Sequence, residues 1–159
     1  MPLKYADLEH EVERRCPAGH PLVLRCRPVR EVGGRLEPFP TLFWLACDDV
    51  HRQIARIEAE GGVDHARAWL REDAARLAAF SAQHDDYVAE RTALLTDDDR
   101  RRLASAGILD ELRRRGIGGM LARDAVKCLH LHYAHHLARE NLVGAWVDAR
   151  YEVRGCPAP

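Results

Sequence analysis

The chain has 159 residues, of which 47% are hydrophobic and 31% are charged, and its formal net charge is −1. These values are typical of a soluble globular protein, and we expect residues 1–159 to form a single domain. A net charge so close to zero gives no reason to expect binding to nucleic acid or to an anionic membrane. A protein partner remains open.

Five cysteines occur without any CxxC pair, so the sequence indicates neither a disulfide framework nor a paired zinc knuckle. They are Cys16, Cys26, Cys47, Cys128 and Cys156. The N-terminal residues MPLKYADLEHEVERR lack the apolar core of a signal peptide. No apolar run approaches the roughly 18 residues of a membrane span. We therefore expect a reduced, cytoplasmic protein.

The first third of the chain predicts one helix and two strands. Tyr5, Leu8 and Val12 are spaced for one helical face, so a helix is expected from Tyr5 to Arg15. Two prolines and a glycine break it before a strand from Leu22 to Cys26. A connection that turns at Gly33-Gly34 leads to the apolar strand Thr41 to Cys47. We expect these two strands to pair as an antiparallel ribbon.

The rest of the chain is predicted to be mainly helical. The expected helices are one from Asp48 that buries Val50, Ile54 and Ile57; one capped by Asp64 that runs to about Arg91; a short one opened by a Thr96–Asp99 capping box; one or two turns from Ile108 to Arg115; and one from Gly118 to Asn141. A strand from Val143 to Val147 and a frayed tail from Arg154 follow. The expected fold is α+β and mostly α, a helical bundle with a small antiparallel β-ribbon.

The predicted helix 118–141 carries a Cys/His stripe. With Cys128 at zero on a helical wheel, His135 falls near about −20° and His132 near about +40°. A thiolate and two imidazoles suit zinc, and also iron. We predict these three residues as metal ligands, with the set completed by Cys16 or Cys47. The same stripe allows two other interpretations, a thiol activated by His132 and plain core packing.

A second polar stripe lies on the predicted helix that ends near Arg91. Asp73, His84 and Tyr87 fall within about 40° of Arg91 on the wheel. Polar groups on a packing face are costly unless they are hydrogen-bonded or functional. We predict these four as catalytic residues, with Asp73 and His84 in acid/base or ligand-supporting roles. Tyr87 and Arg91 would hold an anionic substrate.

Three functions compete on these residues. The leading one is a metal-binding protein that is also a candidate enzyme, and it requires the Cys128 stripe to converge with another Cys or His. A non-catalytic protein-interaction module would instead use the stripe as core and expose an apolar patch. A metal-free enzyme or binder of a small anionic ligand requires a pocket lined by the Asp73–Arg91 stripe.

Several phrases, in this order, resemble the bacterial family called domain of unknown function 501. They are RCPAGHP (15–21), PFPTLFWLAC (38–47), the Asp73–Arg91 spacing, GGM (118–120) and VKCLH…AHHLA (126–138). The resemblance spans about residues 15–144. It implies a small cytoplasmic bacterial protein and no assigned reaction.

By position, the resemblance points to a set of residues and less clearly to His132 and His136. The set is Cys16, Gly19, Pro40, Thr41, Asp73, His84, Tyr87, Arg91, Lys127, Cys128, His130 and His135. On this ground Lys127 and His130 join the site as cofactor-binding residues. Residues 141–144, Asn-Leu-Val-Gly, depart from the family's Asn-Pro-x-Gly phrase, which puts the turn there in doubt.

Overall fold

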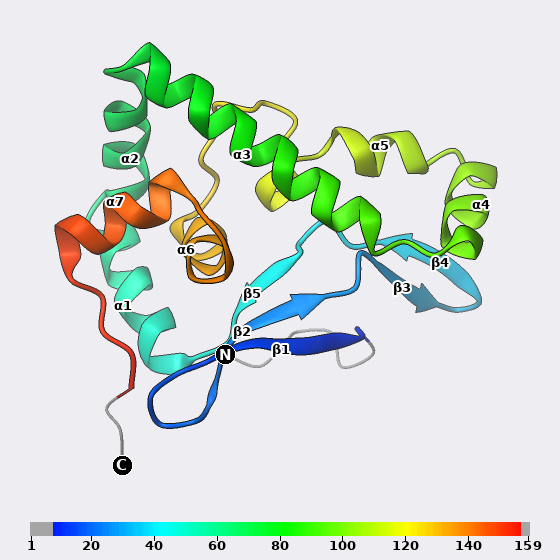
Figure 1. Ribbon diagram of the computed structural model, residues 1–159, viewed down its shortest axis with the longest axis horizontal. Coiled ribbons are helices and arrows are strands. Elements are labelled where there is room, and N and C mark those ends of the chain that lie inside the picture. Colours follow the sequence, from blue (N-terminus) through cyan, green and yellow to red (C-terminus); the bar gives the residue numbers. More distant parts are fainter. Residues whose placement is uncertain (1–7, 157–159) are drawn as a thin grey trace.

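The structure is a computed structural model that describes residues 8–156. Within that range it contains seven α-helices and two small antiparallel sheets, so the predicted α+β, mostly helical class is confirmed. The helices gather on one side of the three-stranded sheet, and α6 (Leu129–Ala138) lies at their centre against β5 (Phe43–Leu45) (Figure 1). None of the helices in this range is long and apolar enough to cross a bilayer.

The three-stranded sheet has the order β1 (His10–Arg15), β2 (Pro21–Cys26), β5. The predicted ribbon is confirmed, because β2 and β5 pair antiparallel with Leu24 opposite Trp44. The predicted helix up to Arg15 is wrong from His10 onward, and Tyr5 lies outside the described residues. Pairing with β2 supplies the backbone hydrogen bonds of this segment, and such tertiary pairing overrides a weak helical pattern.

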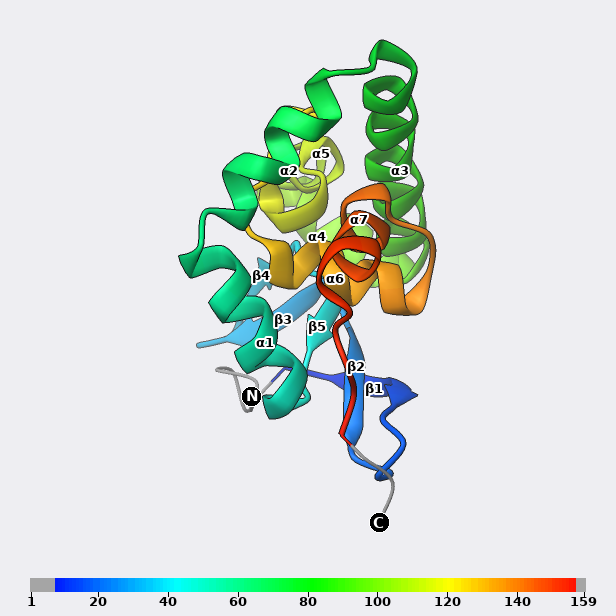
Figure 2. The same cartoon turned by 90° about the vertical axis from the view of Figure 1, so that its left-hand side faces the viewer.

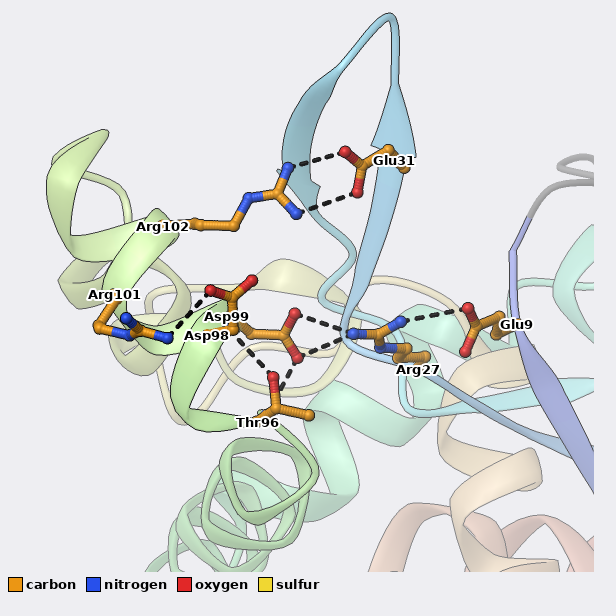
Figure 3. Close-up of polar contacts among 8 residues, drawn as sticks. All are labelled: Glu9, Arg27, Glu31, Thr96, Asp98, Asp99, Arg101 and Arg102. Atoms are coloured by element: carbon orange, nitrogen blue, oxygen red, sulfur yellow. Dashed lines mark hydrogen bonds and ion pairs between the residues drawn. The ribbon is translucent and has the colours of Figure 1, made fainter.

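The predicted connection between the two strands folds into a hairpin of β3 (Val29–Val32) and β4 (Arg35–Pro38). Its turn is at Gly33-Gly34 as expected, and both glycines have positive φ, 56° and 76°. Figure 3 shows how α4 (Asp97–Ser105) is tied to this region. Asp99 accepts two hydrogen bonds from Arg27, at 2.8 and 3.0 Å, and also closes the predicted capping box with Thr96.

Helix α1 (Asp48–Ala59) buries the three predicted apolar residues, Val50, Ile54 and Ile57. The single helix predicted up to Arg91 is wrong, because the chain forms α2 (Gly62–Arg71) and α3 (Ala74–Ala93). Asp73 separates them: its carboxylate accepts hydrogen bonds from the N–H groups of Ala75 and Arg76 and so caps a new helix. Helix α5 (Leu109–Arg114) matches the expected one or two turns.

The predicted helix 118–141 is wrong in its first half. A short 3-10 turn at Ile117–Gly119 is followed by irregular chain, and α6 begins only at Leu129. Side chains from α1 and α2 take over the hydrogen bonds that a helix would make. Arg67 donates to the carbonyl oxygen of Val126 at 2.7 Å, and Glu58 accepts from the Leu129 N–H at 2.5 Å. Cys128 is therefore the N-cap residue of α6.

The strand predicted at 143–147 is also wrong, because these residues lie in α7 (Leu142–Tyr151). Asn141 caps this helix by accepting a hydrogen bond from the Gly144 N–H at 3.0 Å, so the turn forms without the family's proline. A Cβ on Gly144 would lie 2.1 Å from Cβ of His136. The glycine therefore lets α7 pack directly on α6.

Candidate metal centre

The turn between β1 and β2 holds the first two residues of the site. Cys16 N donates to the carbonyl oxygen of His20 at 2.9 Å, and Gly19 N donates to that of Cys16 at 2.8 Å. Gly19 has a φ of 82°, which favours glycine. Burial of the thiol raises the pKa of Cys16, but hydrogen bonds to its sulfur, led by the N–H groups of His20 and Ala18, outweigh this and lower it. The turn is thus built to stabilise a thiolate.

A third residue comes from the junction of β5 and α1. Cys47 is the N-cap residue of α1 and is buried. Its Sγ lies 3.2 Å from Sγ of Cys156. Asp49, in the first turn of the same helix, accepts a hydrogen bond from Cys156 Sγ at 3.1 Å.

The C-terminal segment brings Cys156 to this place. Figures 1 and 2 show the segment after α7 running back toward the β1–β2 turn. Gln53 of α1 holds it through two hydrogen bonds with the backbone of Arg154, at 2.6 and 3.0 Å. The tail was expected to fray from Arg154, yet residues 154–156 are docked and Cys156 is buried; residues 157–159 lie outside the described range.

Three elements distant in the sequence therefore converge on one small volume. Cys16 Sγ, a ring nitrogen of His20 and Cys156 Sγ all lie within 4.8 Å of one another, and Cys47 Sγ is next to Cys156. All of these cysteines are free thiols. A shallow pocket lined in part by His20, Cys47, Asp49 and Cys156 opens beside them. Three thiols and one imidazole are a donor set that zinc takes in tetrahedral sites.

The structure does not bring the predicted stripe of Cys128, His132 and His135 together as a ligand set. Among residues 8–156, three or more ligand atoms cluster at two places, the site above and Glu58–Cys128–His130. The wheel assumed that Cys128 lay within the helix, whereas it precedes the helix in an extended conformation. Cys16 and Cys47 do meet a metal-capable group, but it is Cys156 and not the Cys128 stripe.

His132 and His135 lie in the core with His84. Asn141 Nδ2 donates to Nδ1 of His132 at 3.2 Å and to Nδ1 of His135 at 3.1 Å. The Ile117 N–H donates to Nδ1 of His84 at 3.0 Å. Burial lowers the pKa of His84 to about 4, of His132 to about 3 and of His135 to about 4, so the three imidazoles are neutral at pH 7.

The other members of the predicted catalytic stripe are spread along α3. Asp73 caps its exposed N-terminus, about 16 Å along the axis from His84 at 1.5 Å per residue. The Tyr87 hydroxyl accepts a hydrogen bond from Leu42 N at 2.5 Å. Buried Arg91 donates to the carbonyl oxygens of Pro40 at 2.8 Å and Leu112 at 2.5 Å, and also to that of Arg115. These contacts join α3 to the chain around it.

The two residues proposed for cofactor binding lie near the start of α6. Lys127 Nζ is 3.4 Å from the carbonyl oxygen of Gly118. His130 Nδ1 is 3.1 Å from a carboxylate oxygen of Glu58. In the sequence, these two residues flank Cys128.

Sequence reasoning missed His20, Asp49 and Cys156 at the thiol site. The spacing of Cys16 and His20 across a Pro/Gly turn was visible, since such a turn returns the fifth residue toward the first. Cys156 carried no comparable pattern, because its position depends on how the C-terminal segment folds back.

Comparisons with known proteins agree with the resemblance noted in the sequence. No curated protein and no solved structure matches the chain. The model of one family, described as "Protein of unknown function (DUF501)", matches residues 12–149. The match covers most of the chain and includes Cys16 and Cys47 but stops before Cys156. The chain therefore belongs to the DUF501 family of proteins of unknown function.

Proposed function

We propose that this protein binds a zinc ion through Cys16, Cys47, Cys156 and His20. The observation that supports it is the meeting of three reduced sulfurs from three separate elements beside an imidazole. Tetrahedral zinc with Zn–S bonds of about 2.3 Å separates its sulfurs by about 3.8 Å. The 3.2 Å between Cys47 and Cys156 is about half an ångström shorter than this separation. Cys47 Sγ lies outside the group of three ligand atoms that are all within 4.8 Å of one another, so it would also have to approach Cys16 and His20 to complete the tetrahedron.

The donor set favours zinc over iron, the other metal considered from the sequence. Three thiolates and one imidazole form a closed structural zinc set, whereas iron–sulfur clusters mostly use four thiolates. A closed set leaves no coordination position for substrate. The proposed role of the metal is therefore to hold the C-terminal segment against α1 and the β1–β2 turn.

A disulfide between Cys47 and Cys156 is the competing explanation for the close sulfurs. It would leave Cys16 and His20 without a role, although the ligand atoms of both lie within 4.8 Å of Cys156 Sγ. The two explanations differ in elemental content and in mass, because a disulfide removes two hydrogen atoms and adds no metal.

The test is elemental analysis and native mass spectrometry of tag-free protein purified under reducing, anaerobic conditions. We expect one zinc per chain, lost in Cys47→Ser and Cys156→Ser and bound more weakly in His20→Gln. Cys26→Ala is the matched control: Cys26 is fully buried and belongs to neither group of potential metal ligands, and burial raises its pKa to about 12. A metal-free protein, or one whose metal survives Cys47→Ser, contradicts the proposal.

Metal removal gives an independent measurement. Zinc at about a thousandfold over its dissociation constant adds about 4 kcal/mol to the free energy of unfolding. Thermal unfolding of the wild type is expected at a lower temperature after chelation, while Cys47→Ser is expected to be insensitive to the chelator. Equal shifts in both proteins would show that the chelator acts elsewhere.

A further inference from the structure

A second cluster of reactive groups lies at the N-terminus of α6, on residues separate from the thiol site. Cys128 is the half-exposed N-cap residue, and Glu58 reaches it from α1. Cys128 Sγ, a Glu58 carboxylate oxygen and a ring nitrogen of His130 all lie within 4.8 Å of one another. The cluster thus holds a thiol, an imidazole and a carboxylate together.

Both nitrogens of the His130 ring face oxygen acceptors. Nδ1 is 3.1 Å from Glu58 Oε1, and Nε2 is 3.2 Å from the carbonyl oxygen of His51. A ring with two acceptors is satisfied only when both nitrogens carry protons. Burial lowers the pKa of His130, but hydrogen bonds to Cys128 and Glu58 outweigh it and raise the pKa to about 9. His130 is therefore an imidazolium at pH 7.

The other ionisable groups around His130 reinforce this charge state. Glu58 is a carboxylate: burial raises its pKa, but contacts led by the His130 side chain outweigh this and lower the pKa below its usual value. The His51 ring lies against His130 with centroids 4.1 Å apart and the ring planes tilted by 38°, and burial lowers the pKa of His51. Cys128 is thus next to a cation and at the N-terminus of a helix, the surroundings in which reactive cysteines are found.

We propose that Cys128 is a nucleophilic thiol that exchanges with small-molecule disulfides. Sulfur is a better-supported target than an acyl carbon, because an acyl transfer needs free N–H groups to hold the oxyanion. Here Glu58 already occupies the Leu129 N–H at 2.5 Å. Displacement at sulfur needs no such donors.

The bonds and electrons of this exchange balance as follows. The Cys128 thiolate attacks one sulfur of the disulfide R–S–S–R, a new S–S bond joins Cys128 to that sulfur, and the original S–S bond breaks. Cys128 is oxidised and the departing sulfur is reduced to a thiolate. That thiolate takes up a proton from water, because both N–H groups of His130 already face oxygen acceptors. A second thiol reverses the reaction and releases Cys128.

The test measures how fast Cys128 reacts with 4,4′-dithiodipyridine across a range of pH. The rate at Cys128 is the wild-type rate minus that of Cys128→Ser, with peptide mapping to confirm the site. We expect His130→Gln to slow this rate by about tenfold near pH 6 and by less than about twofold above pH 9.5, where an unperturbed thiol is largely ionised. Oxidised glutathione is then expected to leave a mixed disulfide at Cys128.

Two further variants separate a reactive site from a folding defect. Glu58→Gln keeps an oxygen for the Leu129 N–H but removes the charge that holds the imidazolium, so it is expected to slow the reaction in the same pH range. His136→Gln is the matched control. His136, eight residues after Cys128, forms a similar pair with a carboxylate: its Nε2 is 3.0 Å from an oxygen of Asp148. This variant is expected to react at the wild-type rate.

Equal rates in the wild type and in folded His130→Gln near pH 6 would overturn the proposal. So would a metal ion that Cys128→Ser removes, since Glu58, Cys128 and His130 would then be its ligands. Zinc at the Cys16 site is measured separately, so each proposal can fail without the other.

Discussion

Histidines less than two turns apart on α6 are held in opposite protonation states. His130 contacts the Glu58 carboxylate and is charged, whereas His132 and His135 share the neutral Asn141 amide and are uncharged. His132 and His135 are at most 3% exposed. The comparison shows that the partner's charge, together with burial, decides what an imidazole does, and that a position on the same helix does not.

The two groups also couple to folding with opposite sign. For His132 and His135 the folded pKa is below the ordinary 6.5, so the unfolded chain binds protons first and stability is lost as pH falls. For His130 the folded pKa of about 9 is above 6.5, so its contribution is complete below pH 6.5 and is lost as pH rises through 9.

Among the changes that test this difference between the histidines, Asn141→Ala should lower the free energy of unfolding most. It leaves two buried imidazole nitrogens without a donor and removes the N-cap of α7. Unpaired buried polar groups cost about 1–3 kcal/mol each and a lost cap about 1. We expect the free energy of unfolding to fall by about 3 kcal/mol in urea titrations. Asn141→Asp keeps the cap oxygen but not the amide donor, so a loss as large as that of the alanine variant would assign the effect to the imidazoles.

The dependence of stability on acid pH tests the neutral histidines. His84, His132 and His135 are neutral in the fold down to about pH 4, so stability should fall between pH 6.5 and 4. Each histidine contributes at most about 1.4 kcal/mol per pH unit. His132→Leu should make the plot of unfolding free energy against pH shallower by about one proton. An unchanged slope would mean that this ring is protonated in the folded protein.

The smallest expected effect is that of Glu58→Gln on stability. A half-buried ion pair with His130 contributes about 1 kcal/mol. Chemical denaturation should show that loss at pH 7, and the difference from wild type should vanish above pH 9 as His130 loses its proton. A difference that persists at high pH would assign the loss to capping of Leu129 N–H instead.

Local patterns in the sequence identified much of the helical fold. The apolar spacing of Val50, Ile54 and Ile57 and the Thr96–Asp99 capping box use neighbours within one or two turns, so they survive in any tertiary context. The ribbon of β2 and β5 was also predictable, because both segments are apolar and bounded by turn residues. The family resemblance likewise depended on local phrases.

The sites were decided by contacts between distant segments. Glu58 and Arg67 stop the helical pattern before Leu129 by satisfying backbone groups from other helices, which turns Cys128 into a cap. Cys47 and Cys156 are 109 residues apart and meet only after α7 and Gln53 direct the chain back. The residues that carry thiol and imidazole chemistry can be identified from the sequence. Which of these residues meet depends on the folded chain, because long-range hydrogen bonds and packing leave no periodic pattern in the sequence.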